Sequence, residues 1–170
     1  MEVQLESMAI EMPPVARHPN RTPFEGVLTI ADEASDKPPS GARGHRVLLP
    51  SKAVEAALPS LLGMALDYAP TLDRHDARRK VGIITAAELE QSQGLRTLAV
   101  AGYLFAQDFP EVVREMAAGE GSLGMSYEIA DAVVVDVHAP VWVLHEFTFT
   151  GAAVLRRDKA AYRKTSIRLV

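Results

Sequence analysis

The sequence predicts an α+β fold in which an antiparallel sheet, curved enough to close into a β-barrel, is flanked by a few short helices. Two observations support this fold class. Segments rich in β-branched and aromatic residues outnumber the helical segments, and the turns between several of them are those of antiparallel pairs. The strands and helices also do not alternate regularly, which argues against a parallel βαβ sheet.

The composition predicts one compact domain in a reducing compartment. The chain has 170 residues, 48% hydrophobic and 24% charged, and a domain of that size needs neither a disulfide nor a metal for stability. It has no cysteine, which excludes disulfides, thiolate zinc sites and cysteine nucleophiles. The formal net charge of −4 argues against a general nucleic-acid binder, although residues 74–80 and 156–164 are locally basic.

Residues 1–22 are expected to form a loosely held tail. They mix charges with three prolines and show no sustained hydrophobic period. The stretch lacks both a basic leader and a long apolar run, so neither a signal peptide nor a membrane anchor is expected. The domain itself is expected over residues 23–160, with residues 161–170 as a C-terminal segment and no internal repeat or linker.

The first part of the domain predicts two strands and a helix. Residues 24–31 (FEGVLTIA) and 45–50 (HRVLLP) are rich in branched residues, and a loop rich in Pro, Gly and Ser separates them over residues 32–44. Ser51 is expected to cap a short helix, which Pro59 ends or kinks.

The second part predicts a hairpin, a helix and further strands. Residues 80–90 and 95–106 flank QSQG, the expected turn of an antiparallel pair. A helix of two to three turns follows, with Asp108 as its N-cap and Gly119 as its C-terminal cap. Beyond it, IADAVVVDV and VWVLHEFTFTGAAVL are rich in β-branched and aromatic residues and are expected to be strands.

The stretch GSLGMSYEI, residues 121–129, places a serine on one face of an expected strand. With a period of two, Leu123, Met125, Tyr127 and Ile129 share the apolar face, and Gly124, Ser126 and Glu128 share the other. The hydroxyl of Ser126 would therefore point away from the core. Such a serine is usually only solvated, and it becomes a nucleophile when a base can take its proton.

His75 is the histidine best suited to act as that base. It lies in LDRHDAR, a turn-prone polar stretch before the glycine-containing strand VGIIT, as a loop-borne base would. The alternative is an exposed histidine beside Asp73 and Asp76. A metal site from these three residues would need another carboxylate, and such clusters usually line a polar turn. No metal or other cofactor is therefore predicted.

The segment LHEF supplies two candidates for the group that orients the base. His145 and Glu146 are neighbours on an expected strand, so their side chains point to opposite faces. A carboxylate at Glu146 would lie among apolar and hydroxyl side chains and needs a partner, for which a histidine nitrogen is suitable. The motifs G-x-S-x-G, GxxxxGK[ST] and HExxH are absent.

The order of these pieces resembles the prohead maturation proteases of tailed bacteriophages. The resemblance rests on the strand beginning FEG, on DRHDARRKVGIIT, on GSLGMSYEI after a short helix and on LHEFTFTGAAVL, and it covers residues 24–160. It matches His75, Ser126 and Glu146 to that family's base, nucleophile and acid. The chain departs from the family in having Thr148 and Thr150 where a serine-valine run is expected.

That family is related to the herpesvirus assemblins, which are serine proteases with a Ser-His-His site on a closed β-barrel wrapped by helices. The relation supports the barrel and makes His145 the alternative third member. Glu146 is preferred because a carboxylate holds an imidazolium more strongly. Arg156 and Arg157 resemble the arginine pair that helps hold an oxyanion-stabilising water in assemblins.

The resemblance implies a serine endopeptidase that needs no cofactor and cleaves scaffold or capsid-protein extensions, and also itself, inside an assembling prohead in the host cytoplasm. Its partners would be capsid and scaffold proteins. A homo-oligomer is left open, and neither a membrane nor a specific nucleic acid is expected. The loop over residues 32–44 and the tail over residues 1–22 are candidates for cleavage sites or substrate-binding lids. The alternative is a noncatalytic capsid-assembly or scaffold-docking protein on the same fold.

Overall fold

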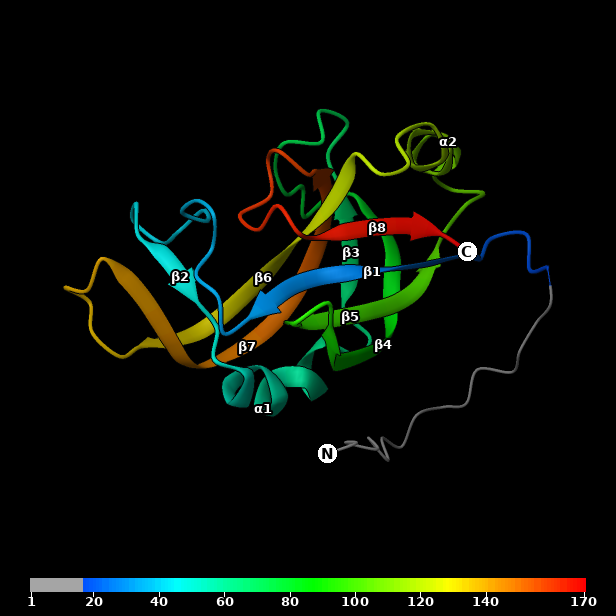
Figure 1. Ribbon diagram of the computed structural model, residues 1–170. Coiled ribbons are helices and arrows are strands. Elements are labelled where there is room, and N and C mark those ends of the chain that lie inside the picture. Colours follow the sequence, from blue (N-terminus) through cyan, green and yellow to red (C-terminus); the bar gives the residue numbers. More distant parts are fainter. Residues whose placement is uncertain (1–16) are drawn as a thin grey trace.

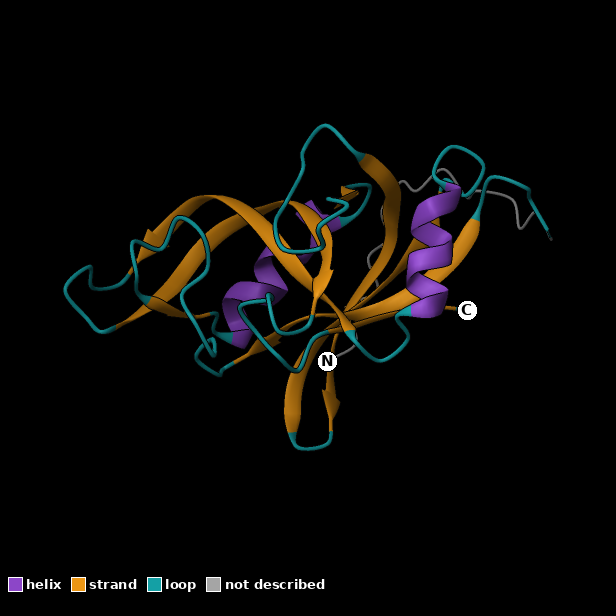
Figure 2. Ribbon diagram, turned by 90° about the horizontal axis from the view of Figure 1, so that it is seen from above, coloured by secondary structure: helices purple, strands orange, loops and turns teal. Residues whose placement is uncertain are grey.

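The computed structural model describes residues 17–170, which form one strongly curved sheet and two short helices (Figures 1 and 2). The strands are β1 (Thr22–Ala31), β2 (Arg46–Leu48), β3 (Ala65–Tyr68), β4 (Lys80–Ser92), β5 (Leu95–Leu104), β6 (Leu123–Val134), β7 (Val141–Arg156) and β8 (Ser166–Leu169). The helices are α1 (Ser51–Leu61) and α2 (Pro110–Ala118). The predicted tail lies largely outside the described residues.

The sheet is mixed and open, so the α+β class is confirmed while the expected closed antiparallel barrel is wrong. The strand order is β2-β7-β3-β4-β5-β1-β8, and β6 pairs with β7. The long strand β7 runs antiparallel to β6 but parallel to both β2 and β3. The eight described strands therefore curl into a half-barrel.

Closure fails where β6 approaches β8. The Met125 N–H donates to the side-chain hydroxyl of Thr165 (3.1 Å), and that hydroxyl donates to the Tyr162 carbonyl (2.9 Å). A backbone donor that a closing strand would use is thus satisfied by a side chain. The β-ladder does not continue across this seam, and the buried Thr165 side chain bridges its two sides.

The β4–β5 hairpin confirms the strongest local prediction. Its two-residue turn consists of Gln93 and Gly94, with φ of 49° and 80°. Two successive positive φ values are those of a type I′ turn, which matches the twist of the flanking strands. The sequence QSQG supplies a glycine at the second of these positions.

The helix α1 differs from its prediction at both ends. Its N-cap is Pro50, and the Ser51 N–H donates instead to the Asp32 carboxylate (2.7 Å). Pro59 lies inside the helix, which continues to Leu61. Ser60, the residue after Pro59, accepts a hydrogen bond from the Phe149 N–H through its hydroxyl (2.9 Å). This bond attaches the end of the helix to β7.

The helix α2 begins and ends close to the predicted positions. Phe109 occupies the N-cap position, while the Asp108 carboxylate accepts a hydrogen bond from the Asn20 side chain (2.8 Å). Gly119 is the C-cap, and its N–H donates to the Glu115 carbonyl (2.8 Å). The contact with Asn20 ties the last residues of the predicted tail to the domain.

The C-terminal segment belongs to the sheet. Its strand β8 pairs antiparallel with residues 24–27 of β1, and the Val170 N–H donates to the Pro23 carbonyl (3.1 Å). The core between the curved sheet and α1 contains Leu28, Leu61, Leu66, Ile84 and Phe149, all fully or almost fully buried. No helix in residues 17–170 is long and apolar enough to cross a membrane.

Candidate active site

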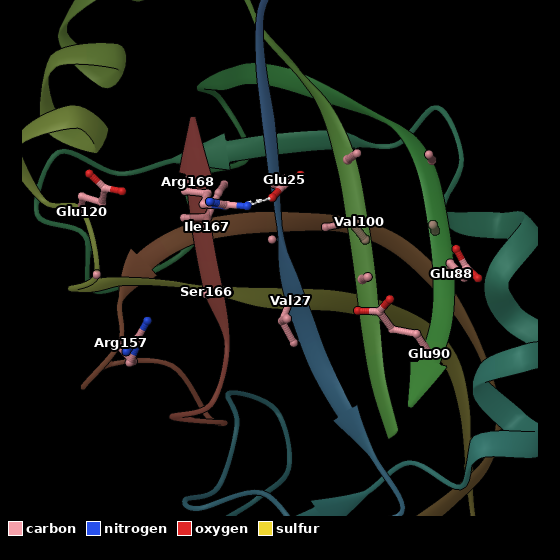
Figure 3. Close-up of a pocket in the computed structure, with 16 residues that line it drawn as sticks. Glu25, Val27, Glu88, Glu90, Val100, Glu120, Arg157, Ser166, Ile167 and Arg168 are labelled. Atoms are coloured by element: carbon pink, nitrogen blue, oxygen red, sulfur yellow. Dashed lines mark hydrogen bonds and ion pairs between the residues drawn. The ribbon is translucent and has the colours of Figure 1, made fainter. Parts of the chain in front are cut away.

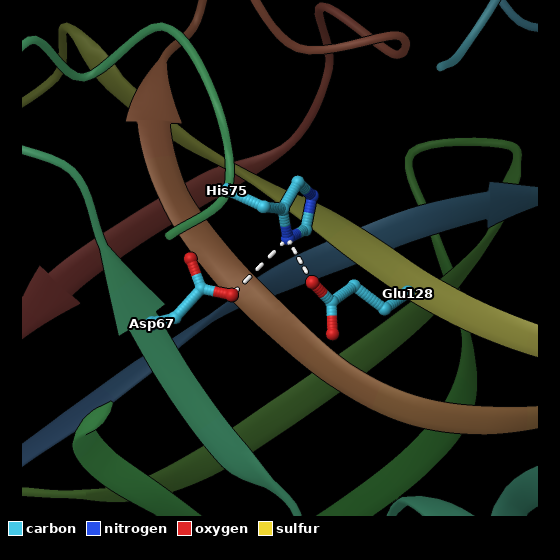
Figure 4. A group of neighbouring side chains, drawn as sticks. All are labelled: Asp67, His75 and Glu128. Carbon is cyan, nitrogen blue, oxygen red and sulfur yellow. Dashed lines mark hydrogen bonds and ion pairs between the residues drawn. The ribbon is translucent and has the colours of Figure 1, made fainter. Parts of the chain in front are cut away.

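The side chain of His75 lies between two carboxylates contributed by distant parts of the chain (Figure 4). Its Nδ1 atom is 3.2 Å from Oδ2 of Asp67 on β3 and 3.0 Å from Oε1 of Glu128 on β6. The contact with Asp67 also has hydrogen-bond geometry. His75 itself is on the turn between β3 and β4, and this turn brings the imidazole back over the end of β3.

The Asp67 carboxylate is completely buried and held from both oxygens. Oδ1 accepts the Asp76 N–H (3.0 Å), which leaves Oδ2 directed at His75. Nζ of Lys80 lies 3.9 Å from Oδ2 and partly compensates the buried charge. A buried carboxylate requires such partners, because an ion without them loses its hydration with nothing in return.

Strand pairing places Ser126 in the same row as Asp67. Asp67 pairs with Ala153 of β7, and Ala153 pairs on its other side with Ser126 of β6. Directly paired residues point to the same face of a sheet, so the two polar side chains face the same way across two strand spacings, about 9.5 Å. Ala153, with its small side chain, lies between them in this row.

The same face of β6 opens into a cavity of about 1050 Å³. Ser126, Glu128 and His75 line it, and so do residues 37–43 of the loop between β1 and β2. Within the described chain the Ser126 hydroxyl is not hydrogen-bonded to His75. Bonds between catalytic groups are often long before substrate binds, so the geometry leaves proton transfer open.

The structure does not bring the predicted third members to His75. Glu146 pairs with Val133, whereas Glu128 pairs with Gly151, five positions along β7 (151 − 146 = 5). Five positions of a strand span about 16 Å. The side chains of His145 and Glu146 are both exposed, and neither contacts His75 among the described residues.

The two arginines expected near the oxyanion also lie elsewhere. Nε of Arg156 is 3.7 Å from the Asp158 carboxylate, and Arg156 does not border the cavity that contains Ser126. Arg157 lines a second hollow, formed by β1, β4, β5 and β8 (Figure 3). Neither arginine therefore borders the cavity that contains Ser126, and their predicted role stays a prediction.

This second hollow is acidic and has no histidine among its described lining residues. Its rim carries Glu25, Glu88, Glu90 and Glu120, and Arg168 pairs with Glu25. This hollow therefore lacks the histidine–carboxylate contacts that the described residues make at His75.

The two aspartates flanking His75 in sequence stabilise their own turn. The Thr71 hydroxyl donates to Asp73 and lowers the pKa of that carboxyl, while the Arg78 N–H does the same for the pKa of Asp76. Their carboxylates therefore do not reach the His75 ring. Two other acids do reach it. Glu128 lies on the face of β6 that the sequence period gave to Ser126, and Asp67 is a lone charged residue between Leu66 and Tyr68 in a short apolar run.

Comparisons with models of known protein families, with curated proteins and with solved structures found no match, so the candidate site is interpreted from its own geometry.

Proposed function

We propose that this protein is a serine endopeptidase in which Ser126 is the nucleophile, His75 the general base and Asp67 the group that orients the base. The observation that supports this function best is the row Asp67–Ala153–Ser126, with the His75 ring held over it by the buried carboxylate. A hydroxyl, an imidazole and a buried carboxylate in that order are the components of a catalytic triad.

Each group has a defined task in the proposed reaction. The Asp67 carboxylate accepts a hydrogen bond from the protonated Nδ1 of His75. Nε2 then has no proton, and its lone pair is free. Nε2 takes the Ser126 proton as Oγ attacks the scissile carbonyl, and later gives it to the leaving amine. Water then hydrolyses the acyl-enzyme by the same route. Asp67 replaces Glu146 as the acid of this proposal.

The proposed substrates are extensions of scaffold and capsid proteins, and the chain's own terminal segments, cleaved during prohead maturation. This narrower assignment depends on the resemblance of the motif order to prohead proteases. It is supported by the size of the cavity and by the loop over residues 37–43 that forms one of its walls, because an extended peptide needs a long cleft with an adjustable side.

Cleavage of a diverse synthetic peptide library, followed by mass spectrometry, tests the proposed activity. The wild-type protein is expected to cut a defined subset of peptides, and Ser126→Ala to lose this activity by several orders of magnitude. Ser122→Ala is the matched control, because the Ser122 hydroxyl only donates to the Gly119 carbonyl in the preceding turn. Equal activity in the two variants would exclude Ser126 as nucleophile.

A noncatalytic docking protein is the second candidate, and one observation favours it. The hairpin formed by β6 and β7 projects from the body of the molecule (Figure 1) and carries Val133, Val135 and Val137, which are 43%, 63% and 56% exposed. Exposed aliphatic side chains on a projecting arm are typical of a contact surface. A folded wild-type protein that cleaves no peptide would favour this function.

A further inference from the structure

We infer that Asp67, His75 and Glu128 form a binding site for one divalent transition-metal ion, with Zn²⁺ as the best fit, and that metal and catalysis exclude each other at His75. The binding claim stands on the three side chains alone. The inhibitory consequence rests on the proposed peptidase function.

Two of the separations between the three donor atoms are close to those that zinc imposes, and the third is within 4.8 Å. Nδ1 of His75 is 3.2 Å from the Asp67 oxygen and 3.0 Å from the Glu128 oxygen, and all three atoms lie within 4.8 Å of one another. Tetrahedral Zn²⁺ binds nitrogen and oxygen at about 2.0–2.2 Å, which places its ligands about 3.3–3.5 Å apart. Small rotations of these side chains are enough to admit the ion.

The charge balance also calls for a cation at this position. One imidazole nitrogen faces two carboxylate oxygens, and only the contact with Asp67 has hydrogen-bond geometry. Glu128 has no other hydrogen bond or ion pair among the described residues, and Lys80 reaches only Asp67. A metal ion between the three atoms would satisfy both carboxylates at once.

The surroundings resemble those of an open metal site. The Asp76 N–H holds the second oxygen of Asp67, as outer-shell donors hold metal-binding carboxylates. His75 and Glu128 border the cavity, so a fourth position remains open to water or substrate. A histidine with two carboxylates, one of them buried, suits Zn²⁺ better than Ca²⁺ or Mg²⁺, which prefer all-oxygen ligands.

Metal binding would remove the base that the peptidase needs. A neutral imidazole that binds metal through Nδ1 carries its proton on Nε2. In the metal-free site the Nδ1 proton faces Asp67 and Nε2 is free to accept the Ser126 proton. Zn²⁺ thus moves the proton from Nδ1 to Nε2, and His75 can no longer act as general base until the metal leaves.

Isothermal titration of the tag-free, chelator-treated protein with Zn²⁺ tests the site. We expect one ion per chain, and affinity at least about tenfold weaker in Glu128→Gln and in His75→Ala. Glu146→Gln is the matched control, since it removes an exposed carboxylate from the neighbouring strand, and it should bind like the wild type. Ser126→Ala should also bind normally. No binding, or equal binding by all variants, overturns the metal site.

Labelling by a serine-directed fluorophosphonate separates this inference from the proposed function. The combined account predicts that metal-free protein is labelled at Ser126 and that stoichiometric Zn²⁺ slows labelling at least about tenfold, with recovery on chelation. Labelling without any Zn²⁺ binding would refute the metal site and leave the peptidase intact. Zn²⁺ binding through His75 and Glu128 without labelling of metal-free protein would keep the site and refute the peptidase.

Discussion

Asp67 is the more deeply buried of the two carboxylates that contact His75. Its carboxylate is fully buried, and its two oxygens face the Asp76 N–H and the imidazole. In the proposed reaction this arrangement fixes the His75 tautomer and stabilises the imidazolium that forms when Ser126 loses its proton. The proposed reaction therefore requires a negative charge at position 67, and not only a hydrogen-bond acceptor.

Replacing Asp67 by Asn is expected to lower kcat by roughly 10³- to 10⁴-fold, the scale seen when a triad carboxylate is neutralised. The asparagine can still accept the Asp76 N–H, so the fold should survive. Turnover of a peptide identified from the library, measured beside the far-UV circular dichroism of the variant, checks both expectations.

Glu146→Gln provides the control for this experiment. It removes a carboxylate that the structure places about 16 Å along β7 from the partner of Glu128, and it should retain nearly full turnover. The opposite result, an inactive Glu146→Gln and an active Asp67→Asn, would contradict the assignment of Asp67.

The sequence was sufficient to single out Ser126 and His75 as candidates, but not Asp67, the buried carboxylate that contacts His75. The period of β6 put Ser126 and Glu128 on one face, and the structure has both on the cavity wall. The acid depends on which residues oppose one another across β3, β7 and β6, and β7 has several register shifts against β6. A shift of one residue in the register between two strands changes the partner of every residue, and no local signal in LHEF encodes the register.

At the level of secondary-structure elements, a hydrogen-bonded side chain bridges the seam between β6 and β8. Thr165 is completely buried, accepts the Met125 N–H and donates to the Tyr162 carbonyl. These two bonds hold the open edges of the half-barrel together where no backbone ladder exists. The residue bonded at this seam, Met125, directly precedes Ser126 on β6.

Thr165→Val keeps the shape of the side chain but leaves a buried N–H without an acceptor. The free energy of unfolding is expected to fall by about 1–3 kcal/mol, the usual cost of an unsatisfied buried donor. Urea unfolding of the variant measures this loss. Thr148→Val, at an exposed position on β7, should change stability by no more than about 0.5 kcal/mol.

A comparable loss in both threonine variants would show that the hydroxyl of Thr165 is not what holds the seam.

The contrast between the β4–β5 hairpin and the seam also explains which elements could be predicted from the sequence. The β4–β5 turn is encoded in adjacent residues, whereas the parallel pairing of β3 with β7 joins strands about 85 positions apart in the chain (152 − 66 = 86). Hydrophobic pattern alone does not encode such pairing.

For the molecule as a whole, three tyrosines couple stability to alkaline pH. Burial raises the pKa of Tyr68, Tyr127 and Tyr162 above the usual value. The unfolded chain therefore releases these protons first as the pH rises past about 10. Stability from these groups is complete below that pH and declines between it and the higher folded-state pKa values.

Tyr127→Phe should make the loss of stability above pH 10 shallower, because it removes one of the three ionisable hydroxyls and keeps the ring that packs against Phe149. The free energy of unfolding in urea, measured for both proteins between pH 8 and 11, gives the two slopes. Identical slopes would mean that Tyr127 does not contribute to the alkaline transition.

Covalent labelling tests the central claim, that His75 held by Asp67 activates Ser126, most directly. Metal-free wild-type protein is treated with a fluorophosphonate, and peptide mapping locates the adduct. The account predicts one adduct per chain, on Ser126, and almost none in folded His75→Ala under the same conditions. An adduct on another serine, or a folded wild-type protein that remains unlabelled, would contradict it.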